Sequence, residues 1–331
     1  MEFSAIGYIV TLTLSLLAVP LSATAQPVGK PPRIGVLVPG LPTGTNRGVE
    51  AFRQGLRDLG YVEDQTIALE VRWDEHTPER LPEQVAALIR LPVDILVAGG
   101  INAIMAAQHA TTTMPIVMAA QGGRDPVEAG LVASLAHPGG NITGVTLMTS
   151  ETTTKRFEFL REVASGLSRM ALLLDAGHAS RHAHLHDHEA AARELGVHLQ
   201  AVAVRGPDDF EAMFQTLTQE HAQALIMVQS PLIATYRARL AALALAHHLP
   251  TMAGETGYAE AGGLMNYGPS IPESWRRAAY YVDRLLKGAT PATLPVEQPT
   301  RFELAINLQT AKALGLIIPP HLLVLADQVI Q

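Results

Sequence analysis

The densest group of potentially reactive side chains is a histidine-rich segment over residues 178–188. Its histidines are His178, His182, His184, His186 and His188. On a helix, residues 182 and 186 share a face, as do 184 and 188, and either pair could chelate zinc or copper. The two pairs lie on different faces, however, and the spacing places no carboxylate to orient them. We therefore expect an exposed helix face without a dedicated metal site, and we expect His178, in the loop after a strand, to face a ligand.

A second candidate site lies in residues 91–107. An apolar run over residues 93–97 stops at Gly99 and Gly100, and an alanine-rich segment with helical character follows from Asn102. This pattern predicts a buried parallel strand, a glycine turn and a helix start. Open α/β sheets bind ligands at such turns, where the first backbone N–H groups of the helix suit an anionic group.

Motifs of common catalytic sites are missing from the sequence. No G-x-G-x-x-G follows the first strand, no Gly-Lys-Ser/Thr completes the loop over residues 40–44, and neither G-x-S-x-G nor H-E-x-x-H occurs. The chain has no cysteine, which excludes disulfides, thiolate metal sites and a cysteine nucleophile. We predict no catalytic residue, metal or cofactor, and hence a protein that is not an enzyme.

Composition and the first residues indicate an exported globular protein. The 331-residue chain is 48% hydrophobic and 17% charged, with a formal net charge of −7, which argues against nucleic-acid binding. An apolar run over residues 6–18 precedes Ala23-Thr24-Ala25, an A-x-A cleavage pattern, although Glu2 replaces the usual basic residues. We predict a signal peptide over residues 1–25 and, because no cysteine can accept a lipid, a periplasmic protein without a lipid anchor.

Strand and helix patterns alternate along the rest of the chain. Strands are predicted over 33–38, 67–73, 93–97, 113–119 and 142–147, with intervening helices that include a short one over 128–135. The alternation of strands and helices then repeats. Further strands are predicted at 170–174, 196–204, 224–228, 249–253 and 263–267, and the helices between and after them include 181–195, 231–247 and 271–287. This predicts an α/β protein of two Rossmann-like lobes with parallel sheets and a ligand cleft. The first lobe would span 33–147 with a return segment near 270–298, and the second 148–269 with a C-terminal segment near 299–331.

Several segments, in order, resemble one protein family. They are RIGVL, FRQGLRDLGYVEDQTIALEVRW, DILVAGG, TMPIVMA, DPVEAGLVASLAHPGGNITGV, EAGGLMNYG and FELAINLQTAKALGLIIPPHLL, and they span residues 32–331. They are similar to the "ABC sub-bind" solute-binding proteins of ABC transporters, which have the type I periplasmic binding fold. The resemblance implies a binder, acting as a monomer, that closes on a small solute and presents it to an inner-membrane permease. Some family members resemble binders of amino acids, including aromatic ones.

The chain departs from the family at Ile101-Asn102, where a Thr or Ser and a Pro are more common, and in its histidine-rich helix.

The ligand would be gripped by loops at the strand ends of both lobes. Gly100, Ile101 and Asn102 are expected to bind a carboxylate, Asp125 or Glu255 an ammonium group, and Trp73 or Tyr258 an apolar part. Core or surface packing remains an alternative for Trp73 and Tyr258, and a turn role for Asp125. The full predicted set is Thr45, Asn46, Trp73, Gly99, Gly100, Ile101, Asn102, Gln121, Asp125, His178, Gln229, Ser230, Glu255 and Tyr258.

Closure is expected to occur at a hinge. Residues 147–151 and 267–270 are the predicted hinge strands, and ligand contacts to both lobes would favour the closed form. Two alternatives stay open, a sensory protein that presents its ligand to a membrane receptor and an exported Rossmann-like enzyme. An amino acid or related carboxylate is the favoured solute, with sugars and nucleosides not excluded.

Overall fold

The computed structural model describes residues 30–42, 46–75, 77–147 and 152–331. The predicted signal peptide, Thr45 and hinge residues 148–151 lie outside these ranges. Residues Pro32–Gln331 form one compact unit. Within the described ranges, no helix combines the length and the hydropathy that a membrane span requires.

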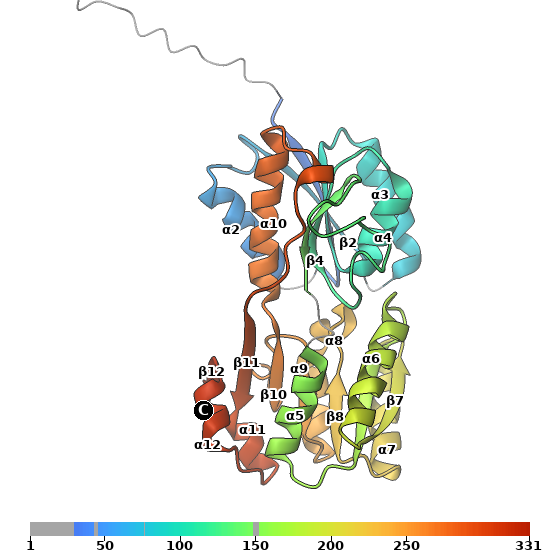
Figure 1. Ribbon diagram of the computed structural model, residues 1–331, viewed down its shortest axis with the longest axis vertical. Helices are drawn as coiled ribbons and strands as arrows, with labels where there is room; N and C mark the ends of the chain where they lie inside the picture. The colour runs from blue at the N-terminus through green and yellow to red at the C-terminus, as the bar shows by residue number, and fades with distance from the viewer. Residues whose placement is uncertain (1–29, 43–45, 76, 148–151) are drawn as a thin grey trace, which may run out of the picture. The chain divides into compact units, whose positions relative to one another are not determined.

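The first lobe is built on a five-stranded parallel sheet with strand order β2-β1-β3-β4-β5 (Figure 1). Its strands are β1 (Arg33–Val38), β2 (Ala68–Trp73), β3 (Ile95–Gly99), β4 (Ile116–Gln121) and β5 (Ile142–Thr146). Its helices are α2 (Arg47–Asp58), the 3₁₀ turn η1 (Pro78–Arg80), α3 (Leu81–Arg90) and α4 (Ile101–Ala110). Apolar side chains of the strands pack into two clusters, one beneath α2 and one beneath α3 and α4. Both faces of the sheet are thus covered, as the continuous apolar runs predict.

One expected helix of this lobe is absent. Residues 128–135 form turns and bends, so the predicted short helix is wrong. Asp125 accepts a hydrogen bond from Val127 N at 2.7 Å, and Ala129 N donates to Asp125 O at 2.9 Å. Gly130 then takes φ 68°, a left-handed conformation that ends the turn before a helix can extend.

The second lobe holds a seven-stranded sheet with strand order β12-β11-β10-β9-β8-β6-β7. Its strands are β6 (Arg169–Asp175), β7 (His198–Val204), β8 (Ala224–Met227), β9 (Thr251–Ala253), β10 (Met265–Pro269), β11 (Phe302–Asn307) and β12 (Gln328–Ile330). Its helices are α5 (Thr153–Val163), α6 (Arg181–Glu194), η3 (Pro207–Asp209), α7 (Phe210–Gln219), α8 (Pro231–Thr235), α9 (Arg237–Ala246), α11 (Leu308–Ala313) and α12 (Pro320–Leu325). The predicted helix over 231–247 is divided in two at Tyr236, which takes φ −101° and ψ 17°.

The two-lobed α/β fold with parallel sheets is confirmed, with one exception in strand direction. Strands β10 and β11 pair antiparallel. The chain runs from β10 into α10 (Ile271–Leu286), which packs on α2 of the first lobe, and comes back through η4 (Pro291–Thr293) to β11 (Figure 1). Two strands that carry the chain in opposite directions between the lobes must pair antiparallel.

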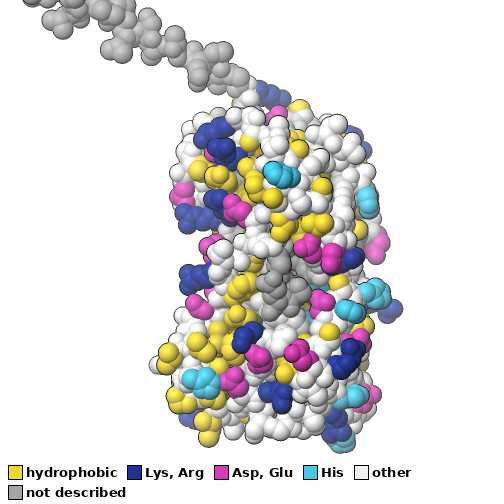
Figure 2. Space-filling model, viewed as in Figure 1, with side chains coloured by type: hydrophobic (Ala, Val, Ile, Leu, Met, Phe, Trp, Pro, Cys, Tyr) yellow, Lys and Arg dark blue, Asp and Glu magenta, His cyan; other side chains and the backbone are white. Residues whose placement is uncertain are grey.

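Acidic and basic side chains are interspersed over the face of both lobes shown in Figure 2. This distribution accords with the moderate net charge of −7.

Candidate functional site

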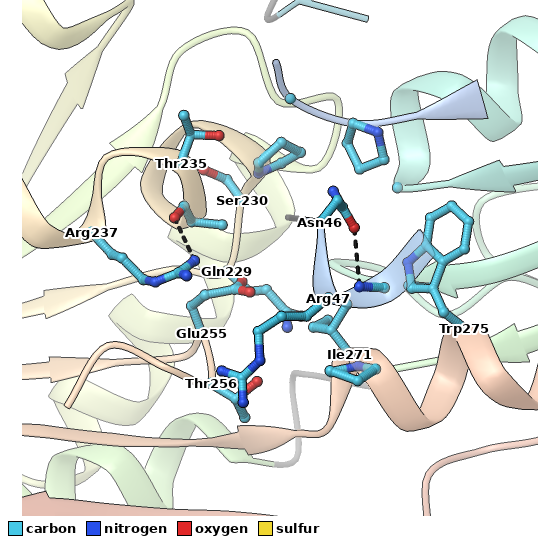
Figure 3. A pocket seen from close by; sticks show the side chains of 18 of the residues that line it. Asn46, Arg47, Gln229, Ser230, Thr235, Arg237, Glu255, Thr256, Ile271 and Trp275 are labelled. Atoms are coloured by element: carbon cyan, nitrogen blue, oxygen red, sulfur yellow. Dashed lines mark hydrogen bonds between the residues drawn. The ribbon is translucent and has the colours of Figure 1, made fainter. Parts of the chain in front are cut away.

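A cavity of about 460 Å³ lies between the loops at the carboxyl ends of the two sheets (Figure 3). The first lobe lines it with Pro39, Gly40, Leu41, Asn46, Arg47, Gly48, Gly100, Ala120, Leu147, Ile271, Pro272 and Trp275, and the second with His178, Gln229, Ser230, Pro231, Ala234, Thr235, Arg237, Glu255 and Thr256. This is the edge at which open α/β sheets bind ligands. A solute there would touch both lobes.

Trp275, in the second turn of α10, forms an apolar side of the cavity. Its indole is 2% exposed and meets the ring of Phe52 edge to face, with centroids 6.3 Å apart. The ring lies so close to Gly48 and Gly99 that a Cβ there would stand 2.7 Å and 2.3 Å, respectively, from its nearest atom. Both positions therefore have to be glycine for the indole to keep its place.

Polar groups from the second lobe face Trp275 across the cavity. Ser230 caps α8 by accepting a hydrogen bond from Ile233 N at 3.2 Å, which fixes the preceding residue, Gln229, at the cavity wall. Gln229 is buried, and neither its side-chain nitrogen nor its side-chain oxygen hydrogen-bonds within the described residues. Because an unsatisfied buried amide is costly, Gln229 is a group that a polar ligand would satisfy.

Glu255 is the buried acid of the cavity wall. Burial raises the pKa of its carboxyl to about 7, and the positive charges of Arg237 and Arg156 oppose this rise. The carboxyl therefore changes charge near neutral pH. A ligand ammonium group beside it would favour the charged form.

Two arginines from different lobes flank the loop that carries Glu255. Arg47, in the first turn of α2, is exposed and crosses the cavity toward Thr256, while Arg237 approaches from α9 (Figure 3). A Cβ on Gly257 would lie 3.3 Å from Arg47 Nη1 and 3.8 Å from Arg237 Nε. Both guanidinium groups thus surround one point of this loop and are suited to an anionic group.

The first turn of α4 contacts the second lobe directly. Asn102 Nδ2 donates to Gly177 O, and Ala179 N donates to Asn102 Oδ1, both at 2.9 Å. A second cavity of about 50 Å³ adjoins the cavity of about 460 Å³ and is lined by Gly99, Ile101 and Asn102. Gly100 and His178 line both cavities. The side chain of Asn102 therefore connects the two lobes at a point beside the main cavity.

The histidine-rich helix is not the uniformly exposed face that was expected. His184 and His188 are 5% and 1% exposed, so that prediction is wrong for this pair; His182 and His186 do face outward. The stripe His184, His188, Ala191 and Ala192 packs inward because α6 needs one buried face, to which Leu185 adds a partly buried side chain.

Burial also keeps these histidines neutral. It lowers the pKa of His188 to about 3 and that of His184 well below its ordinary value, and the nearby Arg156 acts in the same direction for both. His188 Nδ1 lies 2.7 Å from His184 O, and because a carbonyl can only accept, Nδ1 carries the proton. The positive charge of Arg156 beside these rings opposes a metal cation, and the described residues contain no group of three or more potential metal ligands.

The structure gathers six of the predicted binding residues around the main cavity: Asn46, Gly100, His178, Gln229, Ser230 and Glu255. Four others do not line either cavity. Tyr258 is fully buried and donates to Thr251 Oγ1 at 2.9 Å, and Trp73 packs half-buried on the first-lobe core. Gln121 is held by Thr146 Oγ1 and Arg124 O, and Asp125 caps its turn. Packing and turn roles account for all four.

Among the cavity residues that the sequence analysis did not select, Arg47, Arg237 and Trp275 matter most for the chemistry of the cavity. Arg47 directly follows Asn46, which was predicted both as a helix cap and as a binding residue. The start of α2 could therefore have indicated Arg47 as well. Nothing local distinguishes Arg237 or Trp275 from ordinary helix residues.

Comparisons with known proteins place the chain in a family. The family model described as "ABC transporter substrate binding protein" matches residues 33–330. A tyrosine-binding protein of Clostridioides difficile (strain R20291) is 22% identical over 271 residues, 82% of this chain and 77% of that protein.

Two solved structures share the fold across most of the chain. The ABC domain in complex with L-Trp from Streptococcus pneumonia superposes with a TM-score of 0.83 at 24% identity, and a conserved domain protein from Vibrio cholerae O1 biovar eltor with 0.82 at 23%. Each comparison covers 91% of this chain and 100% of the other. From its family match and its fold, the chain belongs to the substrate-binding proteins of ABC transporters, a family of solute binders.

Proposed function

We propose that this chain is the solute-binding component of an ABC importer and that it holds an amino acid between its two lobes. The observation that carries the proposal is the pairing of opposite charges in one cavity: a buried carboxyl, Glu255, faces the same space as the guanidinium groups of Arg47 and Arg237. A free amino acid presents the complementary pair, an ammonium and a carboxylate.

Each end of the amino acid has partners in the cavity. Glu255 and the unsatisfied oxygen of Gln229 are suited to accept hydrogen bonds from the ammonium group. One of the two guanidinium groups, that of Arg237 or that of Arg47, is suited to donate to the carboxylate. Leu41, Leu147 and Trp275 would then pack on the remainder of the ligand. The relatives named for tyrosine and L-Trp support an amino acid as the ligand class.

Closure follows from the position of the cavity. In the proposal, residues 33–147 and 270–298 move as the first lobe and residues 148–269 and 299–331 as the second, with bending near residues 147–151 and 267–270. Because Arg47 belongs to one lobe and Glu255 to the other, a ligand that touches both stabilises the closed form. The closed outer surface is what an inner-membrane permease would recognise.

The remaining expectations form part of the same proposal. The A-x-A pattern at residues 23–25 favours removal of a leader and a periplasmic location, and the chain is expected to act as a monomer without a cofactor or nucleic acid. A sensory role uses the same cavity and the same closure, so it differs only in the membrane partner.

A ligand screen tests the proposal. The purified protein is heated with single amino acids, nucleosides and sugars, and a bound ligand raises the melting temperature by mass action. At least one amino acid should raise it, the effect should be lost in Gln229→Ala, and the ligand should be recovered unchanged. Gln108→Ala is the matched control, since Gln108 bonds Gly130 O within the first lobe. A shift with sugars or nucleosides alone, or turnover of the ligand, would contradict the proposal.

A further inference from the structure

Three arginines surround the short loop Gly254–Gly257, which contains one acid, Glu255. A Cβ on Gly254 would lie 3.0 Å from Arg156 Cζ, and a Cβ on Gly257 would lie 3.3 Å from Arg47 Nη1 and close to Arg237. These arginines come from α5, α2 and α9, more than 80 residues apart from one another in the sequence. The fold therefore concentrates positive charge around a single carboxyl.

None of the three arginines forms an ion pair within 4.0 Å with a described acid. Arg156 is 1% exposed; its Nε donates to Tyr267 O at 2.8 Å and its Nη2 has no hydrogen-bond partner among described residues. Arg237 is half-buried and donates only to Ala234 O at 2.9 Å. The side chain of Arg47, which is exposed, makes no hydrogen bond with any described residue. Buried or partly buried cations without counter-charges are costly, so Arg156 and Arg237 call for more negative charge than Glu255 supplies, and the exposed Arg47 adds a third positive charge beside the same loop.

The other titratable groups near the cavity do not supply that charge. Burial lowers the pKa of His178, which keeps its ring neutral. Asp175 and Asp74 line the small adjoining cavity and accept hydrogen bonds from the backbone N–H groups of Gly177 and Gly40 at 2.9 Å and 2.8 Å. Both carboxyls therefore lie at the small cavity and not at the main cavity that Glu255 lines.

We propose that the ligand is an amino acid with a second anionic group, such as L-glutamate or a longer acidic amino acid. The inference rests on the proposed function and narrows its ligand class. Glu255, with Arg156 behind it, is matched to the ammonium group, and Arg47 and Arg237 are matched to one anionic group each. A neutral amino acid such as tryptophan leaves one of these two arginines without a partner. The cavity of about 460 Å³ also admits an acidic amino acid longer than glutamate.

Calorimetric titration at pH 8 with four probes tests the inference. The probes are L-glutamate, L-2-aminoadipate, L-glutamine and L-tyrosine, of which glutamine is the neutral isostere of glutamate. One of the two acidic probes should bind at least about tenfold tighter than glutamine and tyrosine, because its second carboxylate gains a charge-assisted hydrogen bond that the neutral probes cannot make. The preference should weaken in high salt.

Variants of single arginines test which side chains cause the preference for an acidic amino acid. Arg47→Gln and Arg237→Gln should each reduce it to about threefold or less, while Arg57→Gln, an exposed position on the same helix α2 whose side chain bonds Gln54, should leave it unchanged. Equal or tighter binding of tyrosine overturns the inference and leaves the amino-acid proposal standing. Binding of none of the four overturns the inference, and the wider screen then decides the proposed function.

Discussion

Asn102 and Gly177 join the two lobes through a hydrogen bond of 2.9 Å from the Asn102 amide to the Gly177 carbonyl. The same amide accepts from Ala179 N at 2.9 Å, so one side chain of α4 holds both ends of a turn in the second lobe. Both bonds exist only when the lobes are in this arrangement. The contact therefore stabilises this arrangement of the lobes, and under the proposed hinge closure it would favour the closed form independently of any ligand.

Replacing Asn102 tests this contact. Asn102→Ala removes two exposed hydrogen bonds, each worth about 0.5–1.5 kcal/mol, and should weaken ligand affinity by about five- to 150-fold. The melting temperature of the ligand-free protein should change little, because both partners are exposed. Calorimetry and thermal melting measure the two effects. Gln108→Ala on the same helix is the control, and equal affinities in both variants would show that the contact has no part in closure.

The carboxyl of Glu255 predicts a pH-dependent stability. Its folded pKa of about 7 lies above the ordinary 4.5, so the folded state binds the extra proton. The associated stability is complete below pH 4.5, declines as the pH rises through about 7, and amounts to roughly 3 kcal/mol. Glu255→Gln should therefore be more stable than the unchanged ligand-free protein at pH 8 and no more stable at pH 4.5. Urea unfolding at both values measures this, and an equal difference at both would contradict the assignment.

Gly99 is predicted to tolerate no side chain. In Gly99→Ala the new methyl would stand 2.3 Å from Trp275 Cζ2 and 2.9 Å from Pro39 Cδ, and such overpacking costs about 1–3 kcal/mol. Gly206→Ala is the control, because a Cβ there meets nothing within 4 Å. Denaturant melts should show a clear loss for the first and almost none for the second. If the two lose the same stability, the close approach of Trp275 is not what requires glycine.

Hinge closure predicts a change in dimensions. Small-angle scattering of the protein should show a smaller radius of gyration when an amino acid that raises the melting temperature is present at saturation. Asn102→Ala should give a larger radius without ligand than the unchanged protein, since it lacks one contact of the closed form. An unchanged radius with a tightly bound ligand would contradict the hinge.

The sequence predicts the sheets well because buried parallel strands appear as apolar runs bounded by glycine and proline. The strand–glycine–helix unit at residues 95–110 is an example, since Gly100 takes φ 76° where the pattern requires a turn. The antiparallel direction of β11 could not be predicted from local sequence patterns, because it depends on where α10 packs.

The site was less predictable for two physical reasons. His184 and His188 lie on one face of α6 together with Ala191 and Ala192. The sequence pattern predicts that this face is buried only if neutral histidine is treated as an apolar residue. Arg47, Arg156 and Arg237 meet at one loop through tertiary packing, and no local spacing in the sequence signals their proximity.

The two tryptophans of the chain allow the most direct test of ligand binding in the main cavity. Trp275 lines that cavity, whereas Trp73 lies at the end of β2 and lines neither cavity. In Trp73→Phe, titration with a bound amino acid should produce a saturable change in the emission of Trp275, at the concentrations at which calorimetry shows binding. Calorimetric binding with no change in Trp275 emission would contradict a ligand site between the two lobes.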